Sequence, residues 1–161
     1  MDDRRTPETL FAELHLEHAF TVDAAASVDN AKLPRFFDLA RNGLAQSWRG
    51  EKVWCNPPYS DLFAWTYKAL AEVAWGGCLK VVMILPANRT EQRWWQDLIE
   101  PIRDRGLGVS TRYIRGRVKF HGPLGRITSK KGAGSVPFGS VLLIIERPST
   151  PPSSNLKEPN R

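Results

Sequence analysis

The 161-residue sequence has only two cysteines and three histidines, and it contains no long hydrophobic run. Cys55 and Cys78 are not spaced as metal ligands, and the histidines form no cluster with cysteines or carboxylates, so we expect no metal site. Apolar runs such as VVMILPA are far shorter than the ~20 residues of a membrane span, and MDDRRTPETL at the start lacks an apolar signal region. We therefore expect a soluble, intracellular protein with reduced thiols and no membrane partner.

The charge is unevenly distributed along the chain. The formal net charge is +6, but residues 103–131 contain nine basic residues and a single acid, Asp104. That segment carries +8 and leaves −2 for the rest. Such a block indicates a polyanionic partner, although a solvated basic face is equally consistent, and charge does not separate DNA from RNA. The basic residues are Arg103, Arg105, Arg112, Arg115, Arg117, Lys119, Arg126, Lys130 and Lys131.

Short β-prone stretches alternate with helical patterns and give way to a β-rich end. A helix is predicted over residues 6–18 with Thr6 as N-cap, and another begins after Ser60 or Asp61 and ends at Gly76-Gly77. A third is predicted over residues 91–100 with Thr90 as its cap. Pro34 could open a further helix that ends at Asn42-Gly43. Strands are predicted over residues 20–25, 52–55, 79–87, 109–120 and 140–146. This order predicts one α/β domain, residues 1–147, with a mostly parallel, doubly wound sheet that ends in antiparallel strands. Residues 148–161, PSTPPSSNLKEPNR, read as a disordered tail.

The stretch KVWCNPPYS ends a strand abruptly. Two consecutive prolines have no N–H to give to a strand ladder, so the strand must stop at about Asn56. Asn56 and Tyr59 are then held on a stiff turn at the carboxyl end of a strand, which is where ligands bind in α/β sheets.

The groups on this turn suit a planar heterocycle with an exocyclic amine. The Asn56 amide oxygen and the Pro57 carbonyl can accept both hydrogens of an –NH₂ group, and Tyr59 can offer a stacking face. The amine nitrogen of adenine is a poor nucleophile because its lone pair is delocalised. Two accepted hydrogen bonds favour a tetrahedral nitrogen and direct its lone pair at an electrophile. A bare Asn-Pro-Pro is also common in ordinary turns.

Several stretches in one order resemble the small phage-type DNA N-6-adenine-methyltransferases, which use S-adenosylmethionine. They are TPETLFAEL, FTVDAAASVDNAKLPRFF, NGLAQSWRGEKVWCNPPYS, VVMILPANRTEQRWW and RYIRGRVKF, and together they cover residues 5–145. The resemblance implies an abbreviated Rossmann-like methyltransferase sheet and a double-stranded DNA substrate. It also implies a phage or prophage origin, a place in the cytoplasm of a bacterial host, and a possible link to restriction-modification.

The resemblance assigns the catalytic motif to four consecutive residues. Asn56 and the Pro57 carbonyl would bind the target amine, Pro58 would stiffen the backbone, and Tyr59 would stack on the base. Phe120 could stack on its opposite face, or it could be a core residue. The adenine would be flipped out of the duplex, and phosphates would be bound by Arg115, Arg117, Lys119, Lys130 and Lys131.

The same resemblance places a cofactor loop after the first strand. Asp23 could hold the cofactor's amino group, or it could cap a turn, while Ala24 and Ala25 would permit close approach. Thr6 and Pro7 match an element that touches the methionine end of the cofactor, and they are equally good as a plain helix start. Asn42 could contact the adenine of the cofactor or end a helix.

The chain also departs from the usual pattern of such enzymes. No Gly-rich loop follows the first strand, and only 33 residues separate Asp23 from Asn56, so the usual intermediate strands cannot all fit. Three alternatives stay open: methylation of RNA adenine, methylation of a protein glutamine, and a non-catalytic basic DNA-binding module.

Overall fold

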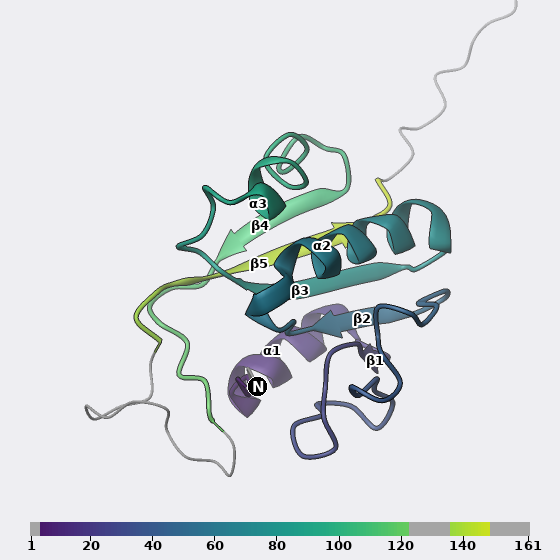
Figure 1. Ribbon diagram of the computed structural model, residues 1–161, viewed down its shortest axis with the longest axis vertical. Helices are drawn as coiled ribbons and strands as arrows, with labels where there is room; N and C mark the ends of the chain where they lie inside the picture. The colour runs from purple at the N-terminus through teal and green to yellow at the C-terminus, as the bar shows by residue number, and fades with distance from the viewer. Residues whose placement is uncertain (1–3, 123–135, 149–161) are drawn as a thin grey trace, which may run out of the picture.

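The computed structural model describes residues 4–122 and 136–148 (Figure 1). A 3-10 turn over Tyr59–Asp61 leads into the second helix, and a π-helical turn over Glu72–Gly76 extends it. The helices are α1 (Glu8–His18), α2 (Leu62–Ala71) and α3 (Arg93–Gln96), and the strands are β1 (Val22–Asp23), β2 (Lys52–Cys55), β3 (Lys80–Pro86), β4 (Val109–Tyr113) and β5 (Ser140–Glu146).

The five strands form one mixed sheet in the order β1-β2-β3-β5-β4. β1, β2 and β3 pair in parallel, and β5 is antiparallel to both β3 and β4. Four strands therefore run in the same direction, and β5 alone is reversed between β3 and β4. The predicted α/β class, with a parallel first part and antiparallel pairing at the end, is confirmed.

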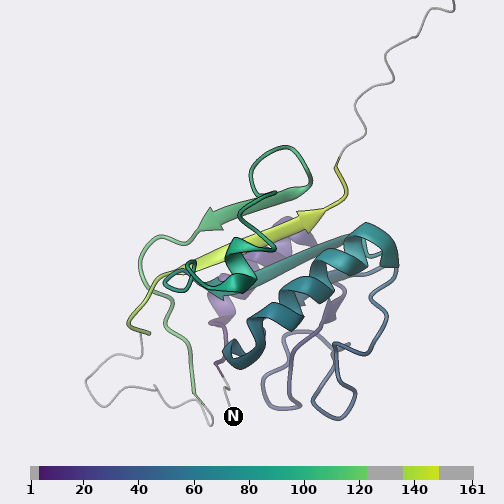
Figure 2. The same cartoon turned by 45° about the horizontal axis from the view of Figure 1, so that its top comes forward.

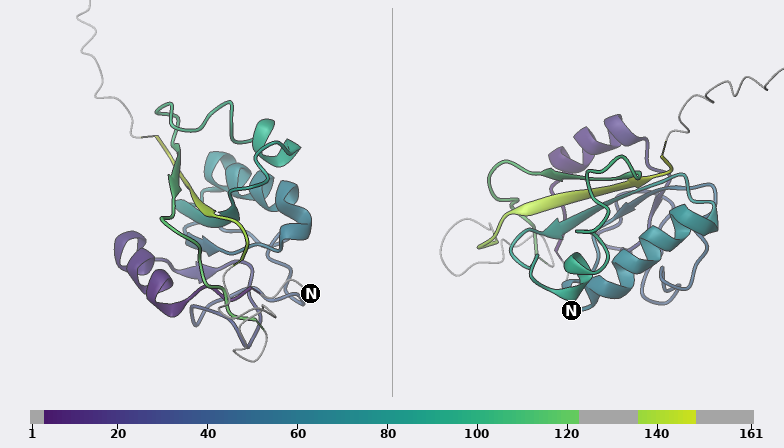
Figure 3. Two further views of the ribbon diagram at one scale, coloured as in Figure 1. Left: turned by 90° about the vertical axis from the view of Figure 1, so that its left-hand side faces the viewer. Right: turned by 90° about the horizontal axis from the view of Figure 1, so that it is seen from above.

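Both faces of the sheet are buried, as the nearly continuous apolar strands predict. Val53 and Cys55 pack with residues of α2 and α3, whereas Trp54 packs with Phe11 and Leu14 of α1. Successive strand residues thus alternate between two core clusters. Figure 3 shows the resulting layers, with α1 on one side of the sheet and α2 and α3 on the other.

The helix expected from Pro34 is wrong, because this segment extends the sheet instead. The Asp23 amide donates to the Arg35 carbonyl at 3.1 Å, and the Phe37 amide donates to the Asp23 carbonyl at 2.9 Å. A parallel bridge between Asp23 and Phe36 lies between these bonds. The backbone over residues 35–37 is therefore held against β1 in an extended form, and Phe37 is buried in the core.

Other predicted boundaries shift as well, and the strand predicted over residues 20–25 is reduced to Val22–Asp23. Pro7, not Thr6, is the N-cap of α1 and makes no side-chain capping bond. α3 begins after Gln92 and has only four residues, and the Thr90 carbonyl accepts a hydrogen bond from the Gln96 side chain at 2.7 Å. The late basic strand stops at Tyr113, and residues 114–120 are not strand.

Within residues 4–122 and 136–148, no helix has the length and apolar character needed to cross a bilayer. The described residues also contain no group of three histidine, cysteine or carboxylate side chains arranged to hold a metal ion. The tail predicted over residues 148–161 lies outside the described residues apart from Pro148.

Candidate active site

The Asn-Pro-Pro-Tyr turn lies where β2 ends, as the two prolines require. Asn56 directly follows Cys55, the last residue of β2. The chain then enters α2, whose N-cap is Asp61; its Oδ1 accepts from the Ala64 amide at 3.3 Å. β1 and β2 are parallel neighbours, so Asp23 and Asn56 come to the same edge of the sheet.

A pocket of about 420 Å³ opens at this edge. Its volume lies within the ~300–1,000 Å³ range of small-molecule sites. The predicted site residues that line it are Thr6, Asp23, Ala24, Ala25, Asn42, Asn56 and Pro58. Pro7, Pro57 and Tyr59 are not among its lining residues. The structure thus joins the predicted cofactor loop and the predicted catalytic asparagine, Asn56, in one cavity.

Asp23 is a buried carboxyl, only 3% exposed, at the end of β1. Its side chain accepts hydrogen bonds from the amides of Lys32 at 3.0 Å and Ala25 at 3.4 Å. Burial raises the pKa of Asp23 to about 6, against the lowering effect of those two bonds. Asp23 therefore caps a turn and also lines the pocket, while its contact with the amino group of a cofactor stays a prediction.

Gly43 lets its loop approach the backbone of Ala24 closely at the end of β1, where the chain has no Gly-rich loop. A Cβ at position 43 would lie 2.1 Å from the Ala24 carbonyl oxygen and 3.1 Å from the Trp65 ring. The loop over residues 42–48 can therefore pack directly against the end of β1. In the sequence alone Gly43 reads as the end of a helix, because its close contact with Ala24 joins segments that are distant in the chain.

Asp38 was also missed. It lines the pocket just beyond the bridge between Phe36 and β1, and its Oδ1 accepts from the Arg41 amide at 2.9 Å. Asn42 lines the same wall with a left-handed φ of 54°, which asparagine tolerates. No helix ends there, so the helix-cap interpretation of Asn42 is wrong. Its contact with the adenine of a cofactor stays a prediction, and its place on the pocket wall is compatible with it.

The Tyr59 ring is not open to a base in this conformation. It is 5% exposed, and the Arg4 guanidinium lies over it at 4.4 Å from the ring centroid. Phe138 packs against it at 6.0 Å, and the Arg89 guanidinium lies 6.0 Å from the centroid. Figure 2 shows the N-terminal segment beside the start of α2, where this turn lies. Arg4 is 55 residues away in the chain and has no local signal, so sequence analysis missed it.

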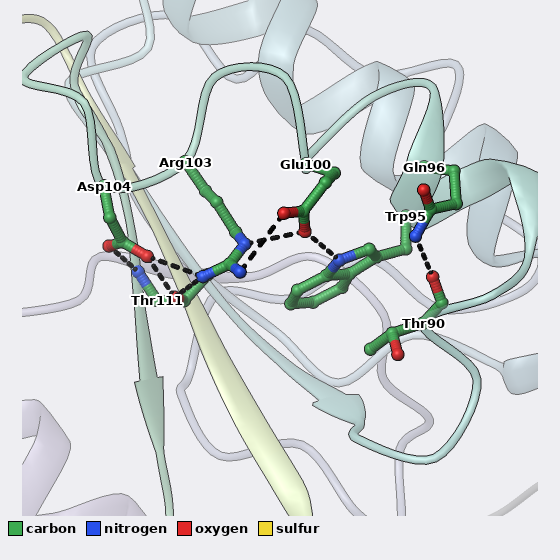
Figure 4. Close-up of polar contacts among 7 residues, drawn as sticks. All are labelled: Thr90, Trp95, Gln96, Glu100, Arg103, Asp104 and Thr111. Atoms are coloured by element: carbon green, nitrogen blue, oxygen red, sulfur yellow. Dashed lines mark hydrogen bonds and ion pairs between the residues drawn. The ribbon is translucent and has the colours of Figure 1, made fainter.

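The first part of the basic segment is engaged within the protein. Arg103 contacts Glu100 at 2.8 Å and Asp104 at 3.0 Å (Figure 4). Glu100 also accepts from the Trp95 ring nitrogen at 2.7 Å. Arg112 makes two bonds of 2.9 Å to Glu17. These two arginines therefore serve the fold, which leaves the later basic residues as the better phosphate candidates.

Residues 117–120 alternate in exposure although they are not strand. Arg115, Arg117 and Lys119 are exposed, whereas Val118 is buried. Phe120 is 1% exposed and belongs to the core cluster on the α1 side, which corrects its expected role as a stacking partner for the base. Its ring is covered by the sheet and α1, as the core interpretation held. Lys130 and Lys131 lie outside the described residues.

Comparison with known proteins shows which protein family the chain resembles. A sequence model of the family described as DNA N-6-adenine-methyltransferase (Dam) matches residues 1–161. Two curated proteins named DNA N-6-adenine-methyltransferase are similar to the chain. The protein of Escherichia phage T1 is 31% identical over 149 residues, which is 83% of this chain and 60% of that protein. The protein of Haemophilus phage HP1 (strain HP1c1) is 31% identical over 62 residues, 38% of this chain and 36% of that protein.

The chain thus spans less than two thirds of the length of either phage protein. The family model nevertheless covers the chain from end to end, and the Asn-Pro-Pro-Tyr turn that carried the resemblance lies at a pocket. The chain belongs to the DNA N-6-adenine-methyltransferase (Dam) family.

Proposed function

We propose that this protein transfers a methyl group from S-adenosylmethionine to N6 of an adenine flipped out of double-stranded DNA. The observation that carries this proposal is that Asn56, at the end of β2, opens onto the same pocket as the buried Asp23 at the end of β1. Relatives named for DNA adenine methylation favour DNA over RNA or protein. The reversed β5 between β3 and β4 supports an abbreviated Rossmann-like methyltransferase sheet.

The residues of the pocket fit S-adenosylmethionine. Asp23 can accept hydrogen bonds from the amino group of the cofactor. The small side chains of Ala24 and Ala25 leave room for the methionine end of the cofactor. Asp38 follows the extended segment beside β1, where an acidic residue suits ribose hydroxyls in α/β nucleotide sites. Asn42 faces the same cavity. When bound, the cofactor supplies an electrophilic methyl group on a sulfonium sulfur.

Asn56 and the Pro57 carbonyl would activate the target amine without a charged base. Each accepts a hydrogen bond from one N6–H, which shifts the nitrogen towards a tetrahedral form and aims its lone pair into the pocket. The gain comes from fixed dipoles and from positioning. As the N–C bond forms, the bond between the methyl carbon and the sulfonium sulfur breaks, and its electron pair stays on sulfur in a neutral thioether product. The methylated nitrogen then carries an extra, strongly acidic proton, which leaves to water.

Stacking of the base on Tyr59 would require the Arg4 side chain to move away from that ring. Flipping itself costs a few kcal/mol of unstacking. Phosphate contacts from Arg115, Arg117 and Lys119 would offset this cost, since all three are exposed on one segment. The bacteriophage origin of the two relatives supports a reaction on DNA in the cytoplasm of a bacterial host.

The test is to identify the methylated product. Purified protein is incubated with S-adenosylmethionine labelled in the methyl group and, in parallel, with duplex DNA of mixed sequence, RNA or protein. Digestion of the DNA to nucleosides should release labelled N6-methyldeoxyadenosine. Label in RNA or protein instead, or binding of DNA with no label anywhere, would contradict the proposal and favour one of the alternative functions.

A further inference from the structure

The side-chain amide of Asn56 is held by the N-terminal segment. Its Nδ2 donates to the Arg4 carbonyl oxygen at 2.5 Å and to Thr6 Oγ1 at 3.2 Å. Thr6 is 2% exposed and precedes α1, and it uses its hydroxyl for this contact rather than for capping the helix. Two acceptors from a segment 50 residues away therefore converge on one amide.

These contacts fix which end of the amide faces which way. A backbone carbonyl can only accept a hydrogen bond, so the –NH₂ end of Asn56 must face Arg4. A flipped amide would place Oδ1 against the Arg4 carbonyl, and two acceptors at that distance repel. With –NH₂ committed to residues 4–6, Oδ1 is the end left on the other side of the planar amide. Arg4, Thr6 and Asn56 all line the pocket, so with Nδ2 occupied, Oδ1 is the side-chain atom of Asn56 left to accept a hydrogen bond from a bound amine.

We propose that Thr6 is a positioning residue that orients Asn56 for catalysis, in concert with the Arg4 carbonyl. This inference rests on the proposed function, because an Asn56 oxygen acting on an amine is what the orientation serves. It differs from the reading in which Thr6 touches the cofactor. A positioning role changes the rate of the chemical step, whereas a cofactor contact changes cofactor affinity.

The chain offers a close set of variants. Thr6→Val keeps the shape of the side chain but removes the acceptor, and Thr6→Ser restores the hydroxyl. Thr66→Val is the matched control, because Thr66 is fully buried on α2 and its hydroxyl has no hydrogen-bond partner among the described residues. Each variant is compared with the wild type in three measurements: the single-turnover rate of methyl transfer to DNA at saturating cofactor, the cofactor dissociation constant, and hydrogen exchange of the Asn56 side-chain amide by NMR.

We expect Thr6→Val to lower the single-turnover rate roughly three- to tenfold, the worth of about one hydrogen bond, while cofactor affinity stays unchanged. Thr6→Ser should recover most of the rate, and Thr66→Val should match the wild type. The Asn56 amide protons should exchange more slowly than those of the exposed Asn88 in the wild type, and this protection should fall in Thr6→Val. A normal rate in Thr6→Val, or a loss of cofactor affinity alone, would overturn the inference.

The exchange measurement separates this inference from the proposed function. If the wild type methylates no adenine, the proposed function fails, and exchange alone then decides whether Thr6 holds Asn56. Asn56 protons that exchange as fast as those of Asn88 would show that no such orientation exists, whatever the enzyme's activity. The Asn56 signals are assigned by their loss in Asn56→Asp.

Discussion

Replacing the buried Gly43 with alanine should damage the proposed cofactor pocket. The added Cβ would lie 2.1 Å from the Ala24 carbonyl oxygen, a contact that no real Cβ makes. The nearby ring of Trp65, at 3.1 Å, blocks the simplest escape. Because the obstacle is backbone, either the end of β1 or the loop that carries Gly43 must shift. Overpacking of this kind costs about 1–3 kcal/mol.

The unfolding midpoint gives the first measurement. At about 2–4 °C per kcal/mol for a chain of this size, Gly43→Ala should lower Tm by roughly 2–12 °C. Its affinity for S-adenosylmethionine should fall as well, because Ala24 and Asn42 line the pocket on either side of the clash. Gly139→Ala is the matched control, since among the described residues its Cβ would meet only the Ala87 side chain, at 3.8 Å. Wild-type stability and cofactor affinity in Gly43→Ala would refute the packing argument.

Three further predictions follow from the burial and pairing of single side chains. Because folding raises the pKa of Asp23 from 3.8 to about 6, its stabilising effect is fully present below about pH 3.8 and is lost as pH rises through 6. Urea titrations give the free energy of unfolding of the wild type and of Asp23→Asn at each pH. The difference between the two proteins should change by up to about 3 kcal/mol from pH 3.8 to above pH 6, and a difference that stays constant would contradict the raised pKa. Phe120→Ala should cost about 3–5 kcal/mol of stability as a core truncation, whereas a fully stable variant with weak methylation would restore the base-stacking role. Arg117→Ala should lower the salt slope of DNA binding by about 1, while Arg112→Ala, which loses the pair with Glu17, should change it little; equal slopes for both would remove Arg117 from phosphate contact.

The elements that sequence predicted well are those with strong local chemistry. The prolines after Asn56 fix the end of β2, and the Asp61 cap fixes the start of α2. Continuous apolar residues identify β3 and β5 as strands buried on both faces. Asp23 and Asn56 could be placed at one edge because parallel neighbours end on the same side.

The parts that sequence predicted poorly depend on contacts between distant segments. Residues 35–37 carry a helix-like pattern, but backbone bonds to β1 hold them extended. Phe120 sits in an alternating basic stretch whose pattern does not say which face is covered; α1 and the sheet decide that. The sequence around Tyr59 does not predict that Arg4 lies over its ring, and the sequence around Asn56 does not predict the hydrogen bond between its amide and Thr6.

The most direct test of the central claim is the rate of the methyl-transfer step in Asn56→Ala. Duplex DNA and S-adenosylmethionine are both held at saturating concentration, so that only the chemical step is compared with the wild type. Loss of a fixed acceptor that acts in the transition state predicts a fall of roughly 10²–10³-fold, with unchanged folding and unchanged affinity for both ligands. A rate within a few-fold of the wild type would show that Asn56 does not activate the adenine amine.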